Sequence, residues 1–479
     1  MSLRDYSILT LLTISLQAVT LGQNQPASTR PAQDQGTPQQ GEDASRATPA
    51  PALTGVVGID SAIAEEDTNG TLPAIPSLLG GPQLSMALGG EAERSNYLRA
   101  GLNVGATYDD NALLTPQDSK SNTTFSVFPN ISLEQVRSRM KWKLAYAAGL
   151  TVNQRLSNRN QGSHDLNFDS QFRLSPHVSL RVAEDFSMIS GAFNSGSTSG
   201  LGTGNGLPNG SLITPLAKQQ TSATVAEMNY HFALKDLVGA SGSFYDLHYS
   251  DAPAGFGLTN TQSASGSAFW LHGLFGRDWA GVTYKFQRVT FDPNGESRVH
   301  SILAVNTINL PNRFTVTGFA GPEHSDNQGL TPAGGGTARH FSDWSMSGGI
   351  EVGWQKDHTS VAAGYSRQTS DGGGVLGVVR LQGVHGQVRQ QLFPGWAAAV
   401  AASYGRNESV TIPTQGSASR INSASVGGSL ERNLGRSLAL NLGYTHDFQE
   451  QFGGALAGSA HRDRFSVTLG YQWSRPLGR

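Results

Sequence analysis

The sequence RFSVTLGYQW at residues 464–473 alternates between two kinds of side chain with a period of two. One set is apolar or aromatic and the other is small or polar: Phe465, Val467, Leu469, Tyr471 and Trp473 against Ser466, Thr468, Gly470 and Gln472. Successive side chains of a β-strand point to opposite faces, so this segment predicts a strand with one apolar face and one polar face. Such a strand suits a wall with lipid outside and water inside, as in a transmembrane β-barrel.

The same alternation begins at Tyr97 and recurs to Trp473, which predicts an all-β fold. We expect a transmembrane antiparallel up-and-down β-barrel of about 18 strands, with about 16 as the alternative, because such barrels have an even strand number. The later strands are expected at 123–134, 139–153, 165–174, 178–189, 219–233, 238–250, 261–272, 279–291, 297–310, 313–324, 342–355, 359–370, 376–391, 396–408, 418–432, 437–448 and 462–473. The alternation is weak in 297–310 and 418–432, so the facing of these two strands stays open.

The composition agrees with a barrel. Only 15% of the 479 residues are charged, 37% are hydrophobic and 58 are glycine, which suits many strands with small inward side chains. There is no cysteine, so a disulfide framework and thiolate chemistry are excluded. The net charge of −2 is too mild for nucleic-acid binding, which requires a strongly basic patch.

The first 96 residues differ from the rest. Residues 1–22 combine Arg4, a short apolar run and small residues near Gly22, which predicts a cleaved signal peptide and export. Residues 23–96 are expected to be a low-complexity, disordered periplasmic segment, because its Gln-, Pro- and Ala-rich start cannot bury enough apolar surface to fold. Within it, residues 54–96 are a linker or, alternatively, a short plug or docking segment. The barrel domain is then 97–479.

The connections alternate between tight turns and longer loops. The long loops are expected at 109–122, 190–218, 325–341 and 449–461, which places turns in the periplasm and loops outside the cell. Loop 190–218 exceeds the usual loop length, and it either folds inward to narrow a channel or forms an extracellular flap.

The first strand and its exit, GATYDDN at residues 105–111, resemble the first strand of a family of Gram-negative outer-membrane porins. This is the β-barrel porin 2 type, common in acidobacteria and often associated with exopolysaccharide loci; the resemblance covers about residues 96–479. It implies a pore in the bacterial outer membrane whose substrate is unassigned. The chain departs from many outer-membrane proteins because its last aromatic, Trp473, is not at the terminus.

The phase that turns apolar residues to lipid turns polar residues to the lumen. We predict ten pore-lining residues: Asn103, Lys141, Lys143, Thr151, Asn153, Asn167, Gln171, Arg173, Arg181 and Lys285. Barrels of this size leave an aqueous channel, so the first hypothesis is passive diffusion of small hydrophilic solutes. The alternatives are an export pore for a secreted polysaccharide, with a periplasmic partner, and a structural or adhesive barrel that binds through its loops.

The sequence carries no sign of an enzyme. The histidines are scattered and none begins a His-Glu-x-x-His zinc motif, so we expect no metal, cofactor or catalytic residue. Asp109, Asp110 and Asn111 either bind a cation in the first loop or simply end the strand. The expected partners are outer-membrane lipid, lipopolysaccharide and the insertion machinery, with a homo-oligomer as a further option.

Overall fold

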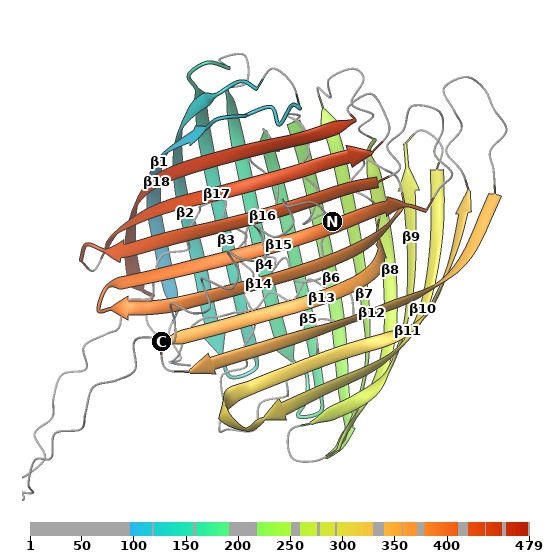
Figure 1. Cartoon of the computed structure of the whole chain (residues 1–479). Helices are drawn as coiled ribbons and strands as arrows, with labels where there is room; N and C mark the ends of the chain where they lie inside the picture. Colours follow the sequence, from blue (N-terminus) through green and yellow to red (C-terminus); the bar gives the residue numbers. More distant parts are fainter. Residues whose placement is uncertain are drawn as a thin grey trace, which may run out of the picture. The chain divides into compact units, whose positions relative to one another are not determined.

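The protein is an 18-stranded antiparallel β-barrel in the computed structural model (Figure 1). The structure describes residues 96–477 except 117–118, 157–159, 191–217, 251–258, 275–277, 293–294, 329–339, 357, 371–377, 411–419, 436 and 453–456. The predicted signal peptide 1–22, the segment 23–95 and nearly all of loop 190–218 therefore lie outside the described residues.

The strands follow one another along the chain, and among the described residues one short 3-10 helix, Pro311–Arg313, lies between β10 and β11. Their bounds are β1 Tyr97–Asp109, β2 Asn122–Arg137, β3 Met140–Asn153, β4 Gln161–Arg173, β5 Val178–Ser190, β6 Lys218–Ala233, β7 Asp236–Ser250, β8 Thr261–Gly273, β9 Trp279–Phe291, β10 Gly295–Leu310, β11 Phe314–Gln328, β12 His340–Lys356, β13 Thr359–Ser370, β14 Val379–Phe393, β15 Trp396–Ser409, β16 Arg420–Asn433, β17 Leu438–Phe452 and β18 Gly458–Pro476. Each strand pairs with its neighbours in the chain.

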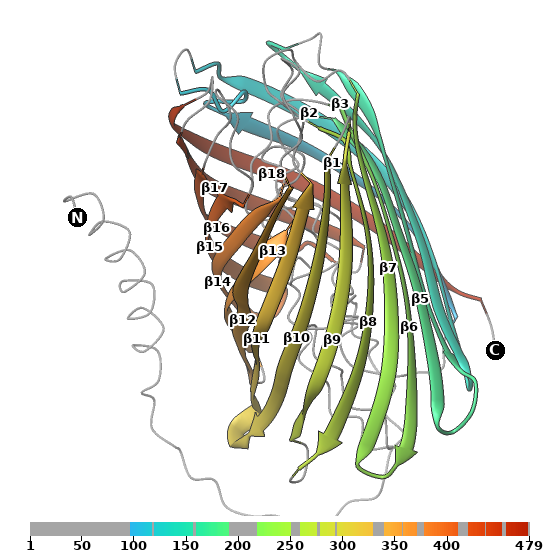
Figure 2. The same ribbon diagram turned by 90° about the vertical axis from the view of Figure 1, so that its right-hand side faces the viewer.

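The sheet closes on itself because β1 pairs with both β2 and β18 (Figures 1 and 2). The closing ladder runs from Tyr97 opposite Pro476 to Asp109 opposite Arg464. Closure removes the unpaired edge that an open sheet would expose, which is the condition for a sheet to cross a bilayer. The predicted fold class and strand number are confirmed.

The outer face of the barrel is apolar. On β18, Phe465, Val467, Leu469, Tyr471 and Trp473 are all exposed. The alternate residues point inward and are mostly small or polar, so the quoted stretch has the two faces that its alternation predicted.

The alternation of tight turns and long loops is less strict than predicted. Only residues 453–457 separate β17 from β18, so the expected long loop 449–461 is wrong, and β9 and β10 are joined by residues 292–294 alone. The strands extend beyond the apolar band, where outward side chains such as His446 and His461 are polar. The loss of apolar alternation made these strand ends look like loop.

Burial resolves the facing of the two strands that the sequence left open. On β16, Val426 is exposed and faces outward, while Ile421 and Ser423 are buried on the inner side. On β10, Ile302 is exposed and faces outward, while Val299, Leu303 and Val305 are buried on the inner side. Apolar residues occupy both faces of β10, which is why its sequence could not assign a facing.

Two prolines interrupt the ladders at predictable places. Pro129 in β2 falls where pairing with β3 lapses, between Val127 opposite Leu150 and Asn130 opposite Ala147. Pro322 in β11 likewise falls in a gap of the β10–β11 ladder. Proline has no N–H to donate, so a strand tolerates it only where the ladder is already broken.

Several inward aromatic rings lie over a glycine on the paired strand. Phe269 of β8 is opposite Gly239, and a Cβ on that glycine would lie 2.2 Å from the Phe269 ring. Phe319 of β11 lies over Gly349 in the same way, with a corresponding distance of 2.5 Å. These ring-over-glycine pairs require glycine, because any side chain would collide with the ring.

One carboxylate breaks the rule for the outer face. Glu184, in the middle of β5, shares the outward face of its strand with Leu180, Val182 and Met188. Its two oxygens accept hydrogen bonds from Ser222, at 2.8 Å, and from Thr224 on β6. Hydroxyl donors therefore supply part of the hydration that lipid cannot give.

Candidate functional site

The inner face of the barrel is the candidate functional site, and the predicted pore-lining residues fall on it. All ten occupy the strand face opposite to outward apolar side chains; Asn103, for example, lies between exposed Leu102 and Val104. The ten positions are Asn103 on β1, Lys141, Lys143, Thr151 and Asn153 on β3, Asn167, Gln171 and Arg173 on β4, Arg181 on β5, and Lys285 on β9.

Five of them lie on β3 to β5 near the end of the barrel that carries the short turns 138–139 and 174–177, which we call the turn end; the opposite end is the loop end. Lys143 is opposite Asp169, Lys141 is opposite Gln171, and Gln171 is in turn opposite Arg181. Asp169 is bound by Arg181 at 3.0 Å, while Arg173 on the same face is exposed. We call Lys141, Lys143, Gln171, Arg173 and Arg181 the basic strip.

The basic strip extends onto β1 and β2. Arg99 there forms an ion pair with Glu134 at 2.9 Å, and both residues face inward. Because Arg99 and Arg181 each have a carboxylate partner at this distance, Lys141, Lys143 and Arg173 carry the excess positive charge of this part of the wall. A solute passing the turn end of the barrel would meet these three cations first.

Two of the remaining predicted residues form hydrogen bonds to other residues of the barrel wall. Asn153 accepts hydrogen bonds from Asn122, at 2.8 Å, and from Thr124, at 3.0 Å. Asn167 donates to Asp185 at 3.3 Å. These hydrogen bonds join neighbouring strands near the loop end. The two amides therefore have fewer hydrogen-bonding groups available for a solute.

Two more predicted residues are enclosed by their neighbours. Lys285 shares a cross-strand row with Ser301 and the buried Glu323. Asn103 is buried next to Gly470, whose missing side chain makes room for the Asn103 amide oxygen. Thr151 is opposite Ser126 on β2.

Taken over all described strands, the inner face carries both signs of charge in similar numbers. Its basic residues are Arg99, Lys141, Lys143, Arg173, Arg181, Lys285, Arg389, Arg462 and Arg464. Its acidic residues are Asp109, Glu134, Asp165, Asp169, Asp185, Glu227, Glu323, Asp343, Glu351, Glu431 and Asp447. Any preference for anions must therefore come from the local excess in the basic strip and not from the wall as a whole.

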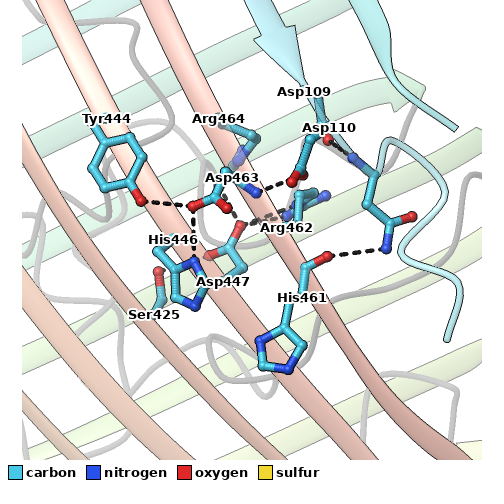
Figure 3. Close-up of polar contacts among 11 residues, drawn as sticks. Asp109, Asp110, Ser425, Tyr444, His446, Asp447, His461, Arg462, Asp463 and Arg464 are labelled. Atoms are coloured by element: carbon cyan, nitrogen blue, oxygen red, sulfur yellow. Dashed lines mark hydrogen bonds and ion pairs between the residues drawn. The ribbon is translucent and has the colours of Figure 1, made fainter. Parts of the chain in front are cut away.

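A buried ionic cluster lies on the inner face where β17, β18 and β1 meet at the loop end (Figure 3). Asp447 accepts hydrogen bonds from Arg462, at 2.8 and 3.1 Å, and from Arg464, at 2.9 Å. Ser425 donates to the other oxygen of Asp447 at 2.8 Å. The Arg462 side chain is fully buried, so this cluster fixes the wall and is not an open binding site.

Sequence reasoning missed this cluster. Arg462 and Arg464 are spaced by two in the stretch HRDRF, which places both on the polar face of the last strand. That spacing was a usable signal, but the partner carboxylate, Asp447, could be found only from the pairing of β17 with β18.

The outer side of the same strands carries a second set of contacts (Figure 3). Asp463 accepts hydrogen bonds from the Tyr444 hydroxyl, at 2.6 Å, and from His446 Nδ1, at 2.8 Å. The Asp463 backbone N–H donates to Asp110 at 2.7 Å, which joins the last strand to the exit of the first.

The three polar residues at the start of the first loop hold its backbone, and Asp109 is the last residue of β1. Asp109 accepts a hydrogen bond from the Asn111 backbone N–H at 2.9 Å, and the Asn111 amide donates to His461 and Thr115 carbonyls at 3.0 Å. The Asp110 carboxylate accepts the hydrogen bond from the Asp463 backbone N–H. Among the described residues, no three His, Asp or Glu side chains come together as metal ligands.

Near the loop end, apolar side chains meet across the interior. Val289 and Phe291, on the inner face of β9, pack against Val378, which immediately precedes β14; Val410 adds to this contact. We call Val289, Phe291, Val378 and Val410 the mouth cluster. It joins strands that lie far apart in the order of the sheet, so it narrows the interior at this level.

A closed barrel with an apolar outer face and a polar inner face is the architecture of bacterial outer-membrane proteins, and the chain is a protein of that class. The part of the chain that the structure describes contains no helix long and apolar enough to cross a membrane.

Comparison with solved structures finds outer-membrane barrels at very low identity. The ferric citrate transporter FecA is 10% identical with a TM-score of 0.43, over 78% of this chain; the match spans 64% of the transporter's length. OpdK of Pseudomonas aeruginosa is 10% identical with a TM-score of 0.41, over 79% of this chain and 99% of OpdK. OccK2 of the same organism, solved with glucuronate, is 9% identical with a TM-score of 0.42, over 80% and 98%. These similarities concern the barrel fold alone.

No protein-family model matches the chain, and no curated protein matches it either. The resemblance to the β-barrel porin 2 type therefore stays a prediction.

Proposed function

We propose that the protein is a porin-like channel through which small hydrophilic solutes diffuse passively across the outer membrane. One observation carries this proposal: the strands turn polar and charged side chains inward all around an 18-stranded ring. Barrels of about 16 to 18 strands are too wide for their own side chains to fill, so a polar inner wall of this circumference encloses water.

Diffusion through such a channel needs no cofactor and no catalytic group. In this proposal, the barrel lies in outer-membrane lipid and lipopolysaccharide and is inserted by the outer-membrane assembly machinery. Export of a polysaccharide would be favoured by a basic lumen, and the mixed charge of the inner face offers no such support.

The test is the electrical conductance of the purified, refolded protein in a planar lipid bilayer. Stepwise currents that scale with salt concentration are expected if the interior is aqueous. If protein that is shown to be folded by its heat-dependent mobility in gels gives no current in any preparation, the channel proposal is wrong.

The basic strip gives the channel a prediction on selectivity. Reversing two of its cations, Lys141→Glu with Lys143→Glu, should shift the reversal potential in a salt gradient towards cation preference, because fixed charge on a channel wall sets ion selectivity. Arg432→Gln is the matched control, since Arg432 lies on the outer face of β16, over the Trp396 ring at 4.9 Å. An equal shift in both variants would mean that the basic strip does not line the conducting path.

A further inference from the structure

The wall of the barrel has an incomplete seam between β12 and β13. The ladder that joins them runs from Lys356 opposite Thr359 only as far as Gly348 opposite Arg367. The next described residues along the two strands, 345–347 of β12 and 368–370 of β13, form no ladder pair, although 345–347 remain paired with β11. The ladder bonds that hold neighbouring strands together are thus missing where the described part of β13 ends.

Side chains close the seam where the ladder stops. Ser347 donates to the Arg367 carbonyl at 3.1 Å, and Arg380 of β14 forms an ion pair with Asp343 of β12 at 2.8 Å. Glu323 of β11 accepts hydrogen bonds from Ser345, at 3.3 Å, and from Thr369 of β13. We call the three contacts that reach β13 or β14 the seam bridges: Ser347 with Arg367, Asp343 with Arg380, and Glu323 with Thr369.

The seam bridges join inward-facing residues of β11 and β12 to outward-facing residues of β13 and β14, which would not meet if all four strands lay side by side in one sheet. Glu323 and Asp343 lie on the inner faces of β11 and β12, on the side opposite to exposed Trp344 and Met346. Thr369 and Arg380 lie on the outward faces of their strands, in phase with exposed Tyr365 and Val384. The outer face of β13 and β14 is therefore tucked against the inner face of β11 and β12, and the wall overlaps itself at the loop end.

The overlap also produces the mouth cluster. Because the start of β14 lies inside β11 and β12, Val378 reaches the inner face of β9 and packs on Val289 and Phe291. The same displacement thus closes the seam and narrows the interior, so the two features belong to one arrangement of β13 and β14.

The closed seam is imperfectly satisfied. The Nε atoms of Arg367 and Arg380 are buried, with no hydrogen-bond partner within the part of the chain that is described. The Arg380–Asp343 pair is itself partly exposed, at 24% and 36%, where ion pairs contribute little. An arrangement that let water reach the two buried Nε atoms would recover these two hydrogen bonds, which offsets part of the cost of opening the seam.

We propose that the loop-end part of β13 and β14 is the gate of the channel. In the closed state the seam bridges hold it against β11 and β12 and the mouth cluster narrows the interior. In the open state the bridges separate, Val378 leaves β9, and a solute passes. This gate rests on the proposed function, since it regulates flow through the same barrel.

The test uses the absence of cysteine from the chain, which makes an introduced pair the only thiols present. Ser345→Cys with Thr369→Cys would join β12 to β13, because both side chains bind the same Glu323 oxygen. The matched control is Thr307→Cys with Thr317→Cys, whose hydroxyls are 3.3 Å apart inside the continuous β10–β11 ladder.

Conductance is measured for each oxidised protein and again after a reductant is added. The gate predicts that the oxidised seam pair loses its steady current and regains it on reduction, while the control conducts throughout. Normal current through a seam pair that gel mobility shows to be oxidised would overturn the gate. Silence of the unmodified protein and of the control would overturn the channel itself, so the two failures are distinguishable.

A second measurement loosens the seam instead of locking it. Arg380→Gln removes the seam ion pair, and it should raise the ratio of open to closed time by up to about fivefold, the limit that a partly exposed ion pair allows. Arg389→Gln, on the same strand, is the control, because its partner Glu431 at 3.4 Å lies outside the seam. No difference in open time between the two variants would contradict the gate.

Discussion

Removing the charge of Asp447 should destabilise the barrel more than any other single change in its ionic residues. Asp447→Asn leaves two guanidinium groups without their carboxylate, and the side chains concerned are almost completely buried: 0% exposed for Arg462, 8% for Arg464 and 4% for Asp447. Removing one partner of a buried ion pair costs about 3–5 kcal/mol, because the charge that stays behind is neither hydrated nor paired. We expect a loss in the lower part of that range, because the buried carboxylate of Asp109 also interacts electrostatically with both arginines and stays in place.

The assay is urea unfolding of the protein in lipid vesicles, followed by tryptophan fluorescence. Asp463→Asn is the matched control: it removes a carboxylate from the neighbouring strand, but this one is 36% exposed and is bound by Tyr444 and His446 on the outer face. Its cost should not exceed about 1 kcal/mol. If the two variants unfold within about 1 kcal/mol of each other, the buried cluster does not stabilise the closure of the barrel as its burial implies.

Two further changes test the two faces of the wall. Gly239→Ala places a Cβ 2.2 Å from the Phe269 ring, so it should lower the free energy of unfolding by about 1–3 kcal/mol, whereas Gly242→Ala, with its nearest atom at 3.8 Å, should have little effect. On the outer face, Glu184→Lys should destabilise the protein by up to about 2 kcal/mol if the position lies at the level of the lipid tails, because lysine costs more there than the glutamate it replaces. Glu184→Leu should then be neutral or stabilising; a loss of stability with leucine as large as with lysine would show that Ser222 and Thr224 depend on the carboxylate and that lipid contact is not the main factor.

The sequence predicted the barrel because its signal is local. The alternation within each strand indicates which side chains face lipid. A carboxylate or guanidinium that faces lipid is so costly that, for most strands, only one of the two possible facings is acceptable. The sequence could not assign the facing of β10 because both of its faces carry apolar residues. Val299 and Leu303 face inward, and Ile302 faces outward.

The candidate site was only partly predictable. Alternation placed the ten lining residues on the inner face, but it could not say that Asn153 and Asn167 are bound to other wall residues, because those partners lie on neighbouring strands in a particular register. The seam was beyond sequence reasoning for the same reason. The lapse of the β12–β13 ladder and the contact of Val378 with β9 depend on how strands are displaced in space, and nothing in one strand's pattern encodes it.

The ring-over-glycine pairs have a consequence for assembly. A tight turn fixes which residues of a hairpin face each other, but β7–β8 and β11–β12 are joined by residues 251–260 and 329–339, which are too long to do so. In these two hairpins Phe269 can lie flat only over Gly239, and Phe319 only over Gly349. A slip by two residues keeps every side chain on its proper face, so hydrophobicity cannot reject it, but it would drive each ring into a neighbouring side chain. Each aromatic residue and its glycine thus select the correct register of these strand pairs while the barrel assembles.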